Sequence, residues 1–482
     1  MSKYYITTSI PYVNGSPHLG HALEFVYADV LARYKRQQGV EQVVFSTGTD
    51  EHGLKIAEKA GQMGVDPLVF TTENTKSFLS LLKQLNISND RFIRTTDPAH
   101  EQRAQLIWQD LEPYIYKKKY SSLYCVGCEE FVTDQTAQDN NGVCPNHNRP
   151  YEKLEEENYF FALSKFSKLV LDPIKSGDFN IIPNSRKNEI VSFIESGLED
   201  ISISRPKEKL SWGVEVPDDK TQVMYVWFEA LLNYITVLGY PEHDDFKTFW
   251  PADMQIIGKD IIRFHAAIWP GILLALHQPL PKALYVHGFV NVDGQKMSKS
   301  LGNSVSPTEI INKYGSDAFR YYFMRHVPSY GDGDFSWDKM DKAYNNELAN
   351  ELGNAVGRVV AMISKYQTDI VGEIPEANHD IHEYEVAMEE CRFDRALDEV
   401  WEQVRGVNQY IDTEKPWAIA KSGDEQHLQQ VLAYAVSGLL EIAYLLEPFM
   451  PETADKIKHI FNEGIVSHPE GPLFPKFDSI AE

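Results

Sequence analysis

The sequence has few cysteines, no secretion signal and no long uninterrupted apolar stretch. Its 482 residues include only four cysteines, and three of them lie close together, which excludes the disulfide framework of a small secreted protein. No basic segment followed by an apolar one opens the chain, and no apolar run is long enough to span a bilayer. We therefore expect a cytoplasmic protein with no membrane partner.

Basic residues are in deficit as well. The chain has 46 lysines and arginines against 70 aspartates and glutamates, a formal net charge of −24, which argues against indiscriminate binding of nucleic acid. A local basic or aromatic patch can still bind RNA selectively within an acidic surface. The sequence also lacks repeats, low-complexity tracts and the G-x-G-x-x-G fingerprint of dinucleotide sites. Its length predicts about two to four domains of ordinary globular composition.

The N-terminal part has the pattern of a strand, a loop and a helix. Residues 4–8 are β-branched or aromatic and predict a buried strand, residues 9–21 are rich in turn formers, and apolar residues then recur at helical spacing up to Gly39. A loop that leads into a helix N-terminus is suited to hold phosphate. His18 and His21 are three residues apart, so both can reach a ligand at the first helical turn. The alternative is one solvated and one packed histidine.

The same design follows at once. Residues 42–47 predict a second buried strand, the letters GTDEHG form a loop, and residues 54–61 return to helical spacing. Two successive strand–loop–helix units indicate an α/β fold with a doubly wound, Rossmann-like parallel sheet and ligands at the carboxyl ends of its strands. Asp50, in the second loop, could place a carboxylate there to receive a substrate ammonium group. It could equally be a turn or capping residue.

Three cysteines and one histidine have the spacing of metal ligands. The pattern is Cys125-x2-Cys128-x15-Cys144-x2-His147, in a segment with few apolar residues. Four thiolate or imidazole ligands fill a tetrahedral zinc shell and leave no open position, which favours a structural zinc ion over a catalytic one. Unmetallated cysteines are the alternative. The fourth cysteine, Cys391, stands alone in a helical pattern and is expected to be a core residue.

Strand and helix patterns alternate again after residue 220. They predict strands at residues 223–228 and 284–290, a helix at 229–238, and a strand, glycine turn and helix over 255–265. Trp227 and Tyr234 lie in this region and are either core residues or part of a binding site.

A polar loop with two lysines follows. Lys296 and Lys299 are three residues apart, and they form either a solvated basic loop or a cation pair that closes over a polyphosphate. Beyond about residue 344 the strand patterns end. Helical periodicity predicts a separate α-helical bundle, with helices at residues 345–366, 381–412, 425–447 and 451–463.

Several of these stretches together resemble one known family. SIPYVNGSPHLGH and KMSKS are similar to the two nucleotide-binding motifs of class I aminoacyl-tRNA synthetases. In combination with GTDEHG, YVWFEALLNY, IGKDIIRFH and a single knuckle of three cysteines and one histidine, they resemble the methionyl-tRNA synthetase family. The motifs occur in the family's order along nearly the whole chain, and as a set they are highly specific.

The resemblance implies a role for individual residues. Those that match ATP-binding positions are Pro17, His18, Gly20, His21, Gly288, Val290, Lys296, Met297, Ser298, Lys299 and Ser300. Those that match the methionine pocket are Ser9, Ile10, Tyr12, Asp50, Trp227, Leu231, Tyr234, Asp260, Phe264 and His265. His18 and His21 correspond to the catalytic histidines that stabilise the α-phosphate, and Asp50 to the carboxylate that binds the ammonium group. Lys296 and Lys299 correspond to the catalytic lysines that clamp the leaving pyrophosphate.

The implied reaction fits these residue types. Methionine attacks the α-phosphate of ATP, which Mg²⁺ accompanies, and the resulting methionyl-adenylate passes methionine to tRNA(Met). The attacking carboxylate is already ionised, so catalysis requires positioning and charge stabilisation rather than a general base. Aromatic residues suit a thioether side chain, and Tyr234 and His265 are candidates to recognise the sulfur by hydrogen bond.

The resemblance also implies a domain order. Residues 1–116 and 221–290 form the two halves of the catalytic domain, 117–220 an insertion with the zinc knuckle, 291–344 the KMSKS loop and stem-contact region, and 345–482 the α-helical anticodon-binding domain. Within the last domain Trp417 matches the family's stacking tryptophan, although it could instead pack between helices. Asn354 and Arg358, one turn apart, are candidate base readers. Some relatives carry an appended C-terminal module after the bundle, and its absence here leads us to expect a monomer.

Three other readings stay open at this point. A class I synthetase for cysteine, isoleucine, leucine or valine is disfavoured because residues 117–220 are too few for an editing insertion and the metal ligands are bunched within them. A non-catalytic tRNA-binding paralogue would be expected to lose HLGH or KMSKS, and both are intact. A nucleotidyltransferase without a tRNA partner would not need the helical bundle.

Overall fold

The computed structural model describes residues 2–132, 134–145, 148–296, 303–367, 371, 373–376, 380–462, 465–468 and 470–477. The chain divides into two compact units. The first contains Met1–Pro17, Gly39–Lys83 and Ser88–Val286, and the second contains His18–Gln38, Gln84–Ile87 and His287–Glu482. The second unit therefore includes a short N-terminal piece of chain, residues 18–38, that the sequence places between the first two strands.

A six-stranded sheet forms the framework of the first unit, and its order is β3-β2-β1-β12-β13-β7. The strands are β1 (Lys3–Thr8), β2 (Gln42–Thr49), β3 (Arg91–Arg94), β7 (Asn180–Ile182), β12 (Met254–Gly258) and β13 (Ala283–His287). β1 pairs in parallel with β2 on one side and with β12 on the other, with Ile6 opposite Phe45 and Met254. Strand order thus reverses beside β1, which confirms the doubly wound α/β class and predicts a ligand site at the carboxyl ends of β1 and β12.

Apolar strand residues and the flanking helices form one core around this sheet. Tyr5, Ile107, Trp269 and Phe161 are essentially buried, together with most side chains of β12. The helices of the first unit include α2 (Leu54–Met63), α3 (Pro67–Gln84), α4 (Pro98–Asp110), α8 (Val226–Leu231), α9 (Asn233–Thr236), α10 (Asp244–Phe249) and α11 (Trp269–Ala275). Buried strands with apolar residues on both faces are typical of parallel sheets covered by helices.

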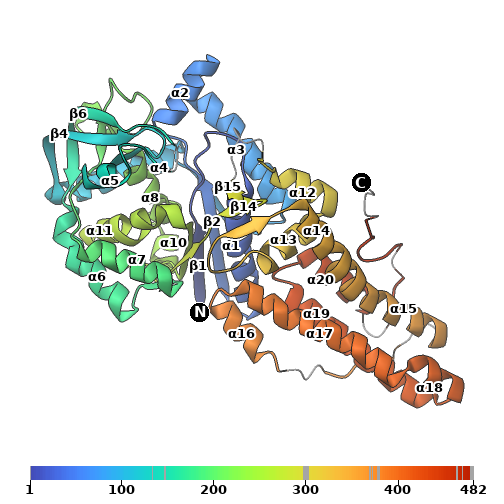
Figure 1. Ribbon diagram of the computed structural model, residues 1–482. Helices are drawn as coiled ribbons and strands as arrows, with labels where there is room; N and C mark the ends of the chain where they lie inside the picture. Colours follow the sequence, from blue (N-terminus) through green and yellow to red (C-terminus); the bar gives the residue numbers. More distant parts are fainter. Residues whose placement is uncertain are drawn as a thin grey trace. The chain divides into compact units, whose positions relative to one another are not determined.

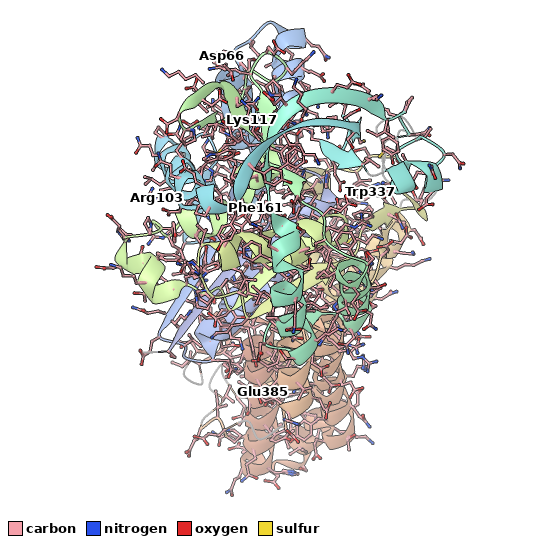
Figure 2. The ribbon with its side chains drawn as sticks, turned by 90° about the vertical axis from the view of Figure 1, so that its left-hand side faces the viewer. Asp66, Arg103, Lys117, Phe161, Trp337 and Glu385 are labelled. Carbon is pink, nitrogen blue, oxygen red and sulfur yellow. The ribbon has the colours of Figure 1, made fainter. Side chains whose placement is uncertain are left out.

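The predicted insertion has two parts. The first is a four-stranded sheet of order β5-β4-β6-β8, in which the long strands β4 (Ile115–Cys125) and β6 (Glu152–Phe161) pair antiparallel. β5 (Glu130–Val132) and α5 (Asp134–Asp139) lie between them in the chain, and β8 (Ile201–Ser202) follows later. Figure 2 labels Lys117 on β4 and Phe161 at the end of β6. The second part contains α6 (Ser167–Ser176) and α7 (Asn184–Glu195), and it supplies β7 to the edge of the main sheet. A small antiparallel sheet of β9 (Ser204–Pro206), β10 (Glu215–Val216) and β11 (Asp219–Met224) completes it.

The second unit begins with α1 (Leu19–Gln37) and a three-stranded sheet of β14 (Val290–Val292), β15 (Gln295–Lys296) and β16 (Gly333–Phe335). Its helices are α12 (Pro307–Tyr314), α13 (Ser316–Arg325), α14 (Trp337–Ala343), a π-helical turn (Tyr344–Gly353), α15 (Asn354–Tyr366), α16 (His382–Glu389), α17 (Phe393–Glu414), α18 (Pro416–Ser422), α19 (Glu425–Leu446) and α20 (Pro451–Ile460). Helices α15, α17, α19 and α20 pack together, shown in orange to red in Figure 1, and confirm the helical bundle.

One helix of the bundle is unusually apolar. Among the described helices, α19 alone is long and apolar enough to cross a membrane by length and composition, and 67% of its most apolar window is buried inside the protein. The expectation that no apolar run reaches this length was therefore wrong by that criterion. Burial of this kind is typical of the core helix of a bundle.

Other sequence expectations need correction. The strand predicted over residues 223–228 ends at Met224, and Val226 begins α8 instead. The residues of this stretch are nearly all buried, and a short run that is apolar on every side cannot be told from a buried helix by periodicity. The helix predicted over 381–412 is two helices, because Cys391 between them has a positive φ of 56°. Residues 98–116 have a helical pattern in the sequence, but α4 ends at Asp110, just before a short turn that contains Pro113.

Candidate active site

The loops that follow β1 and β2 are tied to each other by backbone hydrogen bonds. Asp50 N–H donates to the carbonyl of Pro11 at 2.9 Å, and Val13 N–H donates to the carbonyl of Asp50 at 3.1 Å. Tyr12 and Asp50 thereby form an isolated parallel bridge beyond the ends of the strands. The two sequence motifs that carry these residues are thus brought together at the predicted edge of the sheet.

Asp50 is a buried carboxylate with an unsatisfied oxygen. Only 6% of the residue is exposed, and among the residues that the structure describes its Oδ1 has no hydrogen-bond partner. Burial, together with the negative charge of Glu229, raises the pKa of Asp50 well above its usual range. An unpaired carboxylate oxygen in such a place is costly unless a ligand supplies a donor. A cationic group is the partner that would satisfy it best.

The carboxylate of Glu51, next to Asp50, is fully hydrogen-bonded within the protein. Glu51 accepts from Arg94 Nε and Nη2 at 2.8 Å each, and also from threonine hydroxyls. Burial acts to raise the pKa of Glu51, but the Arg94 and threonine donors outweigh it and lower that pKa. Since Glu51 is occupied, it anchors the loop and leaves Asp50 as the acid available to a ligand.

A buried cluster holds the other side of the same loop. Nδ1 of His52 lies 3.3 Å from Oε2 of Glu229, whose Oε1 lies 2.7 Å from Nε2 of His100. Burial opposes protonation of His52, but the carboxylates of Glu229 and Glu101 raise its pKa to about 10. His52 is therefore a cation at neutral pH. This cluster joins the GTDEHG loop to helix α8, and sequence reasoning missed it because its members are far apart in the chain.

The predicted methionine-pocket residues mostly gather in one apolar cluster. Leu231, Tyr234 and Phe264 belong to the core of the first unit, and Tyr12 and Trp227 pack against it partly exposed. The Trp227 and Phe264 rings stack, with centroids 4.0 Å apart and planes at 14°. Two stacked rings, of which Trp227 is partly exposed, provide the flat, polarizable surface that a thioether prefers.

The remaining predicted pocket residues have different surroundings. Tyr234 Oη lies 2.7 Å from His265 Nε2, and both residues are buried. Ser9 and Ile10 are partly exposed where the chain leaves β1. Asp260, in the turn Lys259–Ile261, is exposed, so its carboxylate does not belong to the buried cluster.

The two histidines of the HLGH motif lie at the start of α1 in the second unit. Gly20 N–H donates to Nδ1 of His18 at 3.1 Å, and His18 N–H donates to Nδ1 of His21 at 3.3 Å. Their rings stack with centroids 3.6 Å apart. The prediction that both histidines share one side of the first turn is confirmed, with the correction that His18 is the N-cap and Pro17 precedes the helix.

This arrangement determines which atoms of the two histidines can bind a phosphate. The expected free backbone N–H groups of the helix start are partly taken by the Nδ1 atoms of the two imidazoles, so the neutral rings carry their hydrogen on Nε2. Burial, and then the neighbouring His18 and His287, lower the pKa of His21 well below its ordinary value. His21 is therefore neutral at pH 7 without a ligand. Gly20 leaves room for the cap, since a Cβ there would come within 3.1 Å of the His18 ring.

The residues predicted to meet adenine lie in a tight backbone crossing of the second unit. A Cβ on Gly288 would stand 1.8 Å from the carbonyl oxygen of Gly331, so only glycine fits. Val290 begins β14, which pairs with β16, and an Asp293-Gly294 turn leads into β15. Lys296 ends β15 with an exposed side chain. Met297, Ser298, Lys299 and Ser300 lie outside the described residues.

Three cysteine sulfurs converge at the knuckle. The Sγ atoms of Cys125, Cys128 and Cys144 lie within 4.8 Å of one another, and those of Cys128 and Cys144 are 3.6 Å apart. Tetrahedral zinc with bonds of about 2.3 Å places its sulfur ligands about 3.8 Å apart, so the three thiols fit such an ion. The cluster can therefore hold a metal. His147, the predicted fourth ligand, lies outside the described residues.

The predicted anticodon residues all belong to the helical bundle. Asn354 and Arg358 are one turn apart on α15, and Asn354 is exposed. Arg358 pairs with Asp412 and lies 3.4 Å from Asn408 Oδ1, both on α17. Trp417 is 39% exposed at the start of α18, which is more than a ring buried between helices would be.

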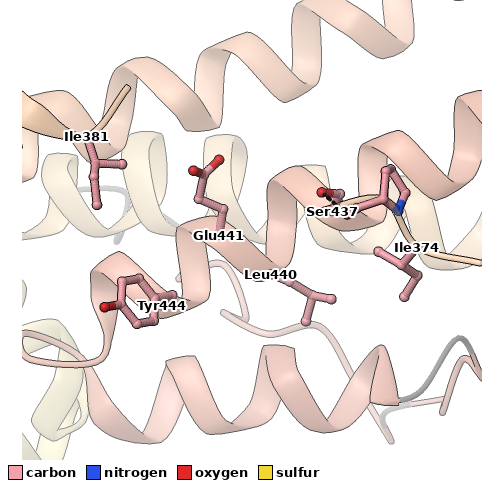
Figure 3. Close-up of a pocket in the computed structure, with 7 residues that line it drawn as sticks. Ile374, Ile381, Ser437, Leu440, Glu441 and Tyr444 are labelled. Carbon is pink, nitrogen blue, oxygen red and sulfur yellow. Dashed lines mark hydrogen bonds between the residues drawn. The ribbon is translucent and has the colours of Figure 1, made fainter. Parts of the chain in front are cut away.

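A separate hollow of about 390 Å³ lies on the bundle. It is lined by Ile374, Pro375, Ile381, Ser437, Leu440, Glu441 and Tyr444. Figure 3 shows Ser437, Leu440, Glu441 and Tyr444 on one helix, α19, with Ile374 and Ile381 on neighbouring parts of the chain. Of the predicted site residues that the structure describes, none lines this hollow.

The sheet topology, the paired loops and the HLGH and KMSKS motifs together define a class I aminoacyl-tRNA synthetase. The family described as "tRNA synthetases class I (M)" matches residues 4–153 and 147–360, and the family described as "Anticodon-binding domain of tRNA ligase" matches residues 374–479. The chain belongs to the methionyl-tRNA synthetase family.

Individual relatives agree with this membership. The chain is 39% identical to the methionine–tRNA ligase of Thermotoga maritima, over 99% of this chain and 81% of that protein. It is 42% identical to the methionine–tRNA ligase of Streptomyces coelicolor, over 94% of this chain and 88% of that protein. Among solved structures, Mycobacterium tuberculosis methionyl-tRNA synthetase in complex with methionyl-adenylate is similar, with a TM-score of 0.93, 35% identity and coverage of 98% of this chain and 100% of that one.

Proposed function

We propose that this protein is a methionine–tRNA ligase. It activates methionine with ATP to give methionyl-adenylate and pyrophosphate, and then transfers methionine to the 3′ end of tRNA(Met). The observation that carries the proposal is the buried Asp50 carboxylate, whose Oδ1 has no partner, in a chain that matches the methionyl-tRNA synthetase family over nearly its whole length. An amino acid's ammonium group supplies the missing donors and the missing positive charge.

The amino-acid site is built from residues of the first unit. Asp50 binds the ammonium group, and the stacked Trp227 and Phe264 rings hold the thioether. Ser9, Ile10, Tyr12, Leu231, Tyr234 and His265 complete the wall of this site. We include Asp260 only as a residue near its rim, because its side chain is exposed.

The activation step needs no general base. The methionine carboxylate is ionised at neutral pH, so it attacks the α-phosphorus directly, a P–O bond forms, and the bond to pyrophosphate breaks. His18 and His21 donate hydrogen bonds from Nε2 to phosphate oxygens, and a bound phosphate favours protonation of His21. Lys296 and Lys299 balance the charge of the leaving pyrophosphate, and Mg²⁺ accompanies the nucleotide. Pro17, Gly20, Gly288, Val290 and the rest of the KMSKS loop contact ATP through backbone and loop atoms.

The transfer step uses the terminal ribose of tRNA as nucleophile. A ribose hydroxyl attacks the adenylate carbonyl, and AMP leaves. The helical bundle binds the anticodon, where an unstacked base can lie on the half-exposed Trp417 ring. Asn354 and Arg358 are the proposed base readers. A single structural zinc ion on Cys125, Cys128, Cys144 and His147 holds the knuckle together. A monomeric state and a cytoplasmic location stay predictions of the sequence.

Two matched variants test the assignment of the sites. Asp50→Asn keeps the volume but removes the charge, so we expect methionine affinity to fall by about two orders of magnitude with little change in the KM for ATP. His21→Ala should instead lower the rate of adenylate formation far more than it weakens methionine binding. The measurements are methionine binding and single-turnover adenylate formation. Equal losses of both quantities in both variants would show that the residues only maintain the fold.

A further inference from the structure

The residue that follows metal ligand Cys128 does not lie in the knuckle core with the cysteines. Glu129 has a positive φ of 54°, is only 3% exposed, and directs its carboxylate toward Lys55, which lies 74 positions earlier in the chain. A positive φ is uncommon for a non-glycine residue and indicates that the surrounding structure holds it there.

The Glu129 carboxylate caps a helix of the catalytic domain. Its Oε1 accepts the backbone N–H of Lys55 at 2.7 Å, at the second position of α2. The N-cap residue of α2 is Gly53, which has no side chain to provide this bond. An acidic acceptor at a helix N-terminus also interacts favourably with the helix dipole. Glu129 therefore fixes the start of α2, four residues after Asp50.

Oε1 of Glu129 also accepts a hydrogen bond from the loop that follows β1. Tyr12 Oη donates to Glu129 Oε1 at 3.1 Å, and the backbone of Tyr12 is bridged to Asp50. The close approach depends on Gly53, since a Cβ there would lie 2.6 Å from Tyr12 Oη and 2.8 Å from Glu129 Oε2. One carboxylate thus holds both segments that flank Asp50.

Two further bonds join the knuckle to the pocket wall. The hydroxyl of Tyr225 donates to the carbonyl of Glu129, and Trp227 Nε1 lies 3.5 Å from the carbonyl of Cys128. Tyr225 precedes α8, and Trp227 is on α8 with its ring stacked on Phe264. The short Cys128–Glu129 segment therefore contacts three of the four chain segments that we assign to the amino-acid site, or residues next to them.

We infer that Glu129 is a positioning residue that couples the metal knuckle to the methionine site by holding Tyr12 and the start of α2 on either side of Asp50. The inference rests on the proposed function, since it takes Asp50 as the ammonium ligand. Glu129 touches neither of the reacting groups. Glu129 holds the methionine site in its binding conformation before methionine arrives. Loss of Glu129 should therefore raise the KM for methionine and leave the KM for ATP and the turnover number nearly unchanged.

The test compares Glu129→Ala with Glu129→Gln and Gln138→Ala. The glutamine keeps an oxygen that can accept from Tyr12 and Lys55, whereas alanine removes both bonds. Gln138 is exposed on α5 of the knuckle and serves as the matched control. Methionine affinity is measured by the change of tryptophan fluorescence on titration, KM and kcat by methionine-dependent pyrophosphate exchange, and bound zinc per chain by elemental analysis.

We expect Glu129→Ala to weaken methionine binding on the order of tenfold, the effect of losing the helix cap and the hydrogen bond from Tyr12, with zinc content unchanged. Glu129→Gln should stay within about threefold of wild type, and Gln138→Ala should be indistinguishable from it. Wild-type affinity in Glu129→Ala would overturn the inference. An equal loss in Glu129→Gln would also overturn it, because charge rather than the two hydrogen bonds would then be the cause.

A second variant keeps the test decisive if Glu129→Ala loses zinc or fails to fold. Tyr12→Phe removes the hydroxyl donor without touching the knuckle. It should weaken methionine binding several-fold both in the wild-type background and in Glu129→Gln, which keeps the acceptor oxygen. Wild-type binding by Tyr12→Phe would overturn the inference. Failure of the proposed function looks different: methionine would then bind Asp50→Asn as well as wild type, which overturns both proposals together.

Discussion

The hydroxyl of Tyr234 donates a hydrogen bond to Nε2 of His265, with the two atoms 2.7 Å apart. The direction follows from the other ring nitrogen, because Nδ1 lies 3.0 Å from the carbonyl oxygen of Ile261, which can only accept. Nδ1 therefore carries the hydrogen, and Nε2 is the acceptor. Burial lowers the pKa of His265 to about 4, so the ring is neutral at physiological pH.

This pairing predicts that the two residues act as a unit. Tyr234→Phe and His265→Asn should each weaken methionine binding, but the double variant should lose less than the two losses added together, with a coupling of about 1–2 kcal/mol. The measurement is a double-mutant cycle on the methionine dissociation constant. Losses that add to within about 0.5 kcal/mol would contradict the pairing.

Recognition of the sulfur is a separate prediction. In the structure the Tyr234 hydroxyl hydrogen is used by His265, so donation to a thioether requires His265 to take its other tautomer when methionine binds. If that happens, Tyr234→Phe should reduce the preference for methionine over norleucine, which has no sulfur, by about tenfold. An unchanged preference would leave packing against the aromatic rings as the sole source of discrimination.

Neutral, buried His265 predicts a pH effect on stability. Its pKa is lower in the folded protein than the unfolded value of about 6.5, so the unfolded state binds more protons between the two values. The stability that the neutral ring permits is therefore complete above about pH 6.5 and is lost as the pH falls toward 4, by roughly 3 kcal/mol. Urea unfolding of wild type and His265→Asn from pH 7.5 to 4.5 measures this, because groups common to both cancel. A difference between them that does not change with pH would contradict it.

Arg320 predicts a large loss of stability in the second unit. Its guanidinium is fully buried, lies 2.7 Å from Asp29 on α1, and donates to the carbonyls of Leu85, Pro448 and Phe449. Arg320→Met keeps much of the volume but leaves Asp29 and the carbonyls short of donors, which should cost about 3–5 kcal/mol. Lys342→Ala, which removes an exposed pair with Asp338 on α14, is the control and should change the free energy of unfolding by less than about 0.5 kcal/mol. Similar effects of the two substitutions would refute this role.

The metal site predicts a difference between two cysteines. Cys144→Ser should lose the bound metal and make the chain between residues 117 and 160 sensitive to protease, because few apolar residues hold that segment together. Cys391→Ser, at a buried cysteine between α16 and α17, should keep the metal. Elemental analysis and limited proteolysis of both variants test this. Full metal content in Cys144→Ser would show that the cysteine is not a ligand.

The sequence was sufficient for the framework and for the residues that belong to recognisable motifs. The alternation of strand, loop and helix predicted the parallel sheet, and the carboxyl-end rule placed Asp50 at its edge. The run from Val223 to Phe228 was assigned to a strand because periodicity carries no information where every side is buried.

Contacts between segments that are distant in the chain could not be predicted from sequence periodicity and motifs. Nothing in the sequence near Glu129 signals that it caps α2, and nothing near Glu229 signals that it pairs with two histidines. The role of His18 as N-cap was also missed, because histidine is not among the common capping residues. These are properties of tertiary geometry, which local periodicity and composition do not determine.

The most direct test of the central claim is amino-acid-dependent exchange of pyrophosphate into ATP, measured for each of the twenty amino acids with the purified protein. We predict exchange with methionine that exceeds exchange with any other amino acid by at least about a hundredfold, and its loss in Asp50→Asn. Exchange driven by valine, isoleucine or cysteine in preference to methionine would contradict the account.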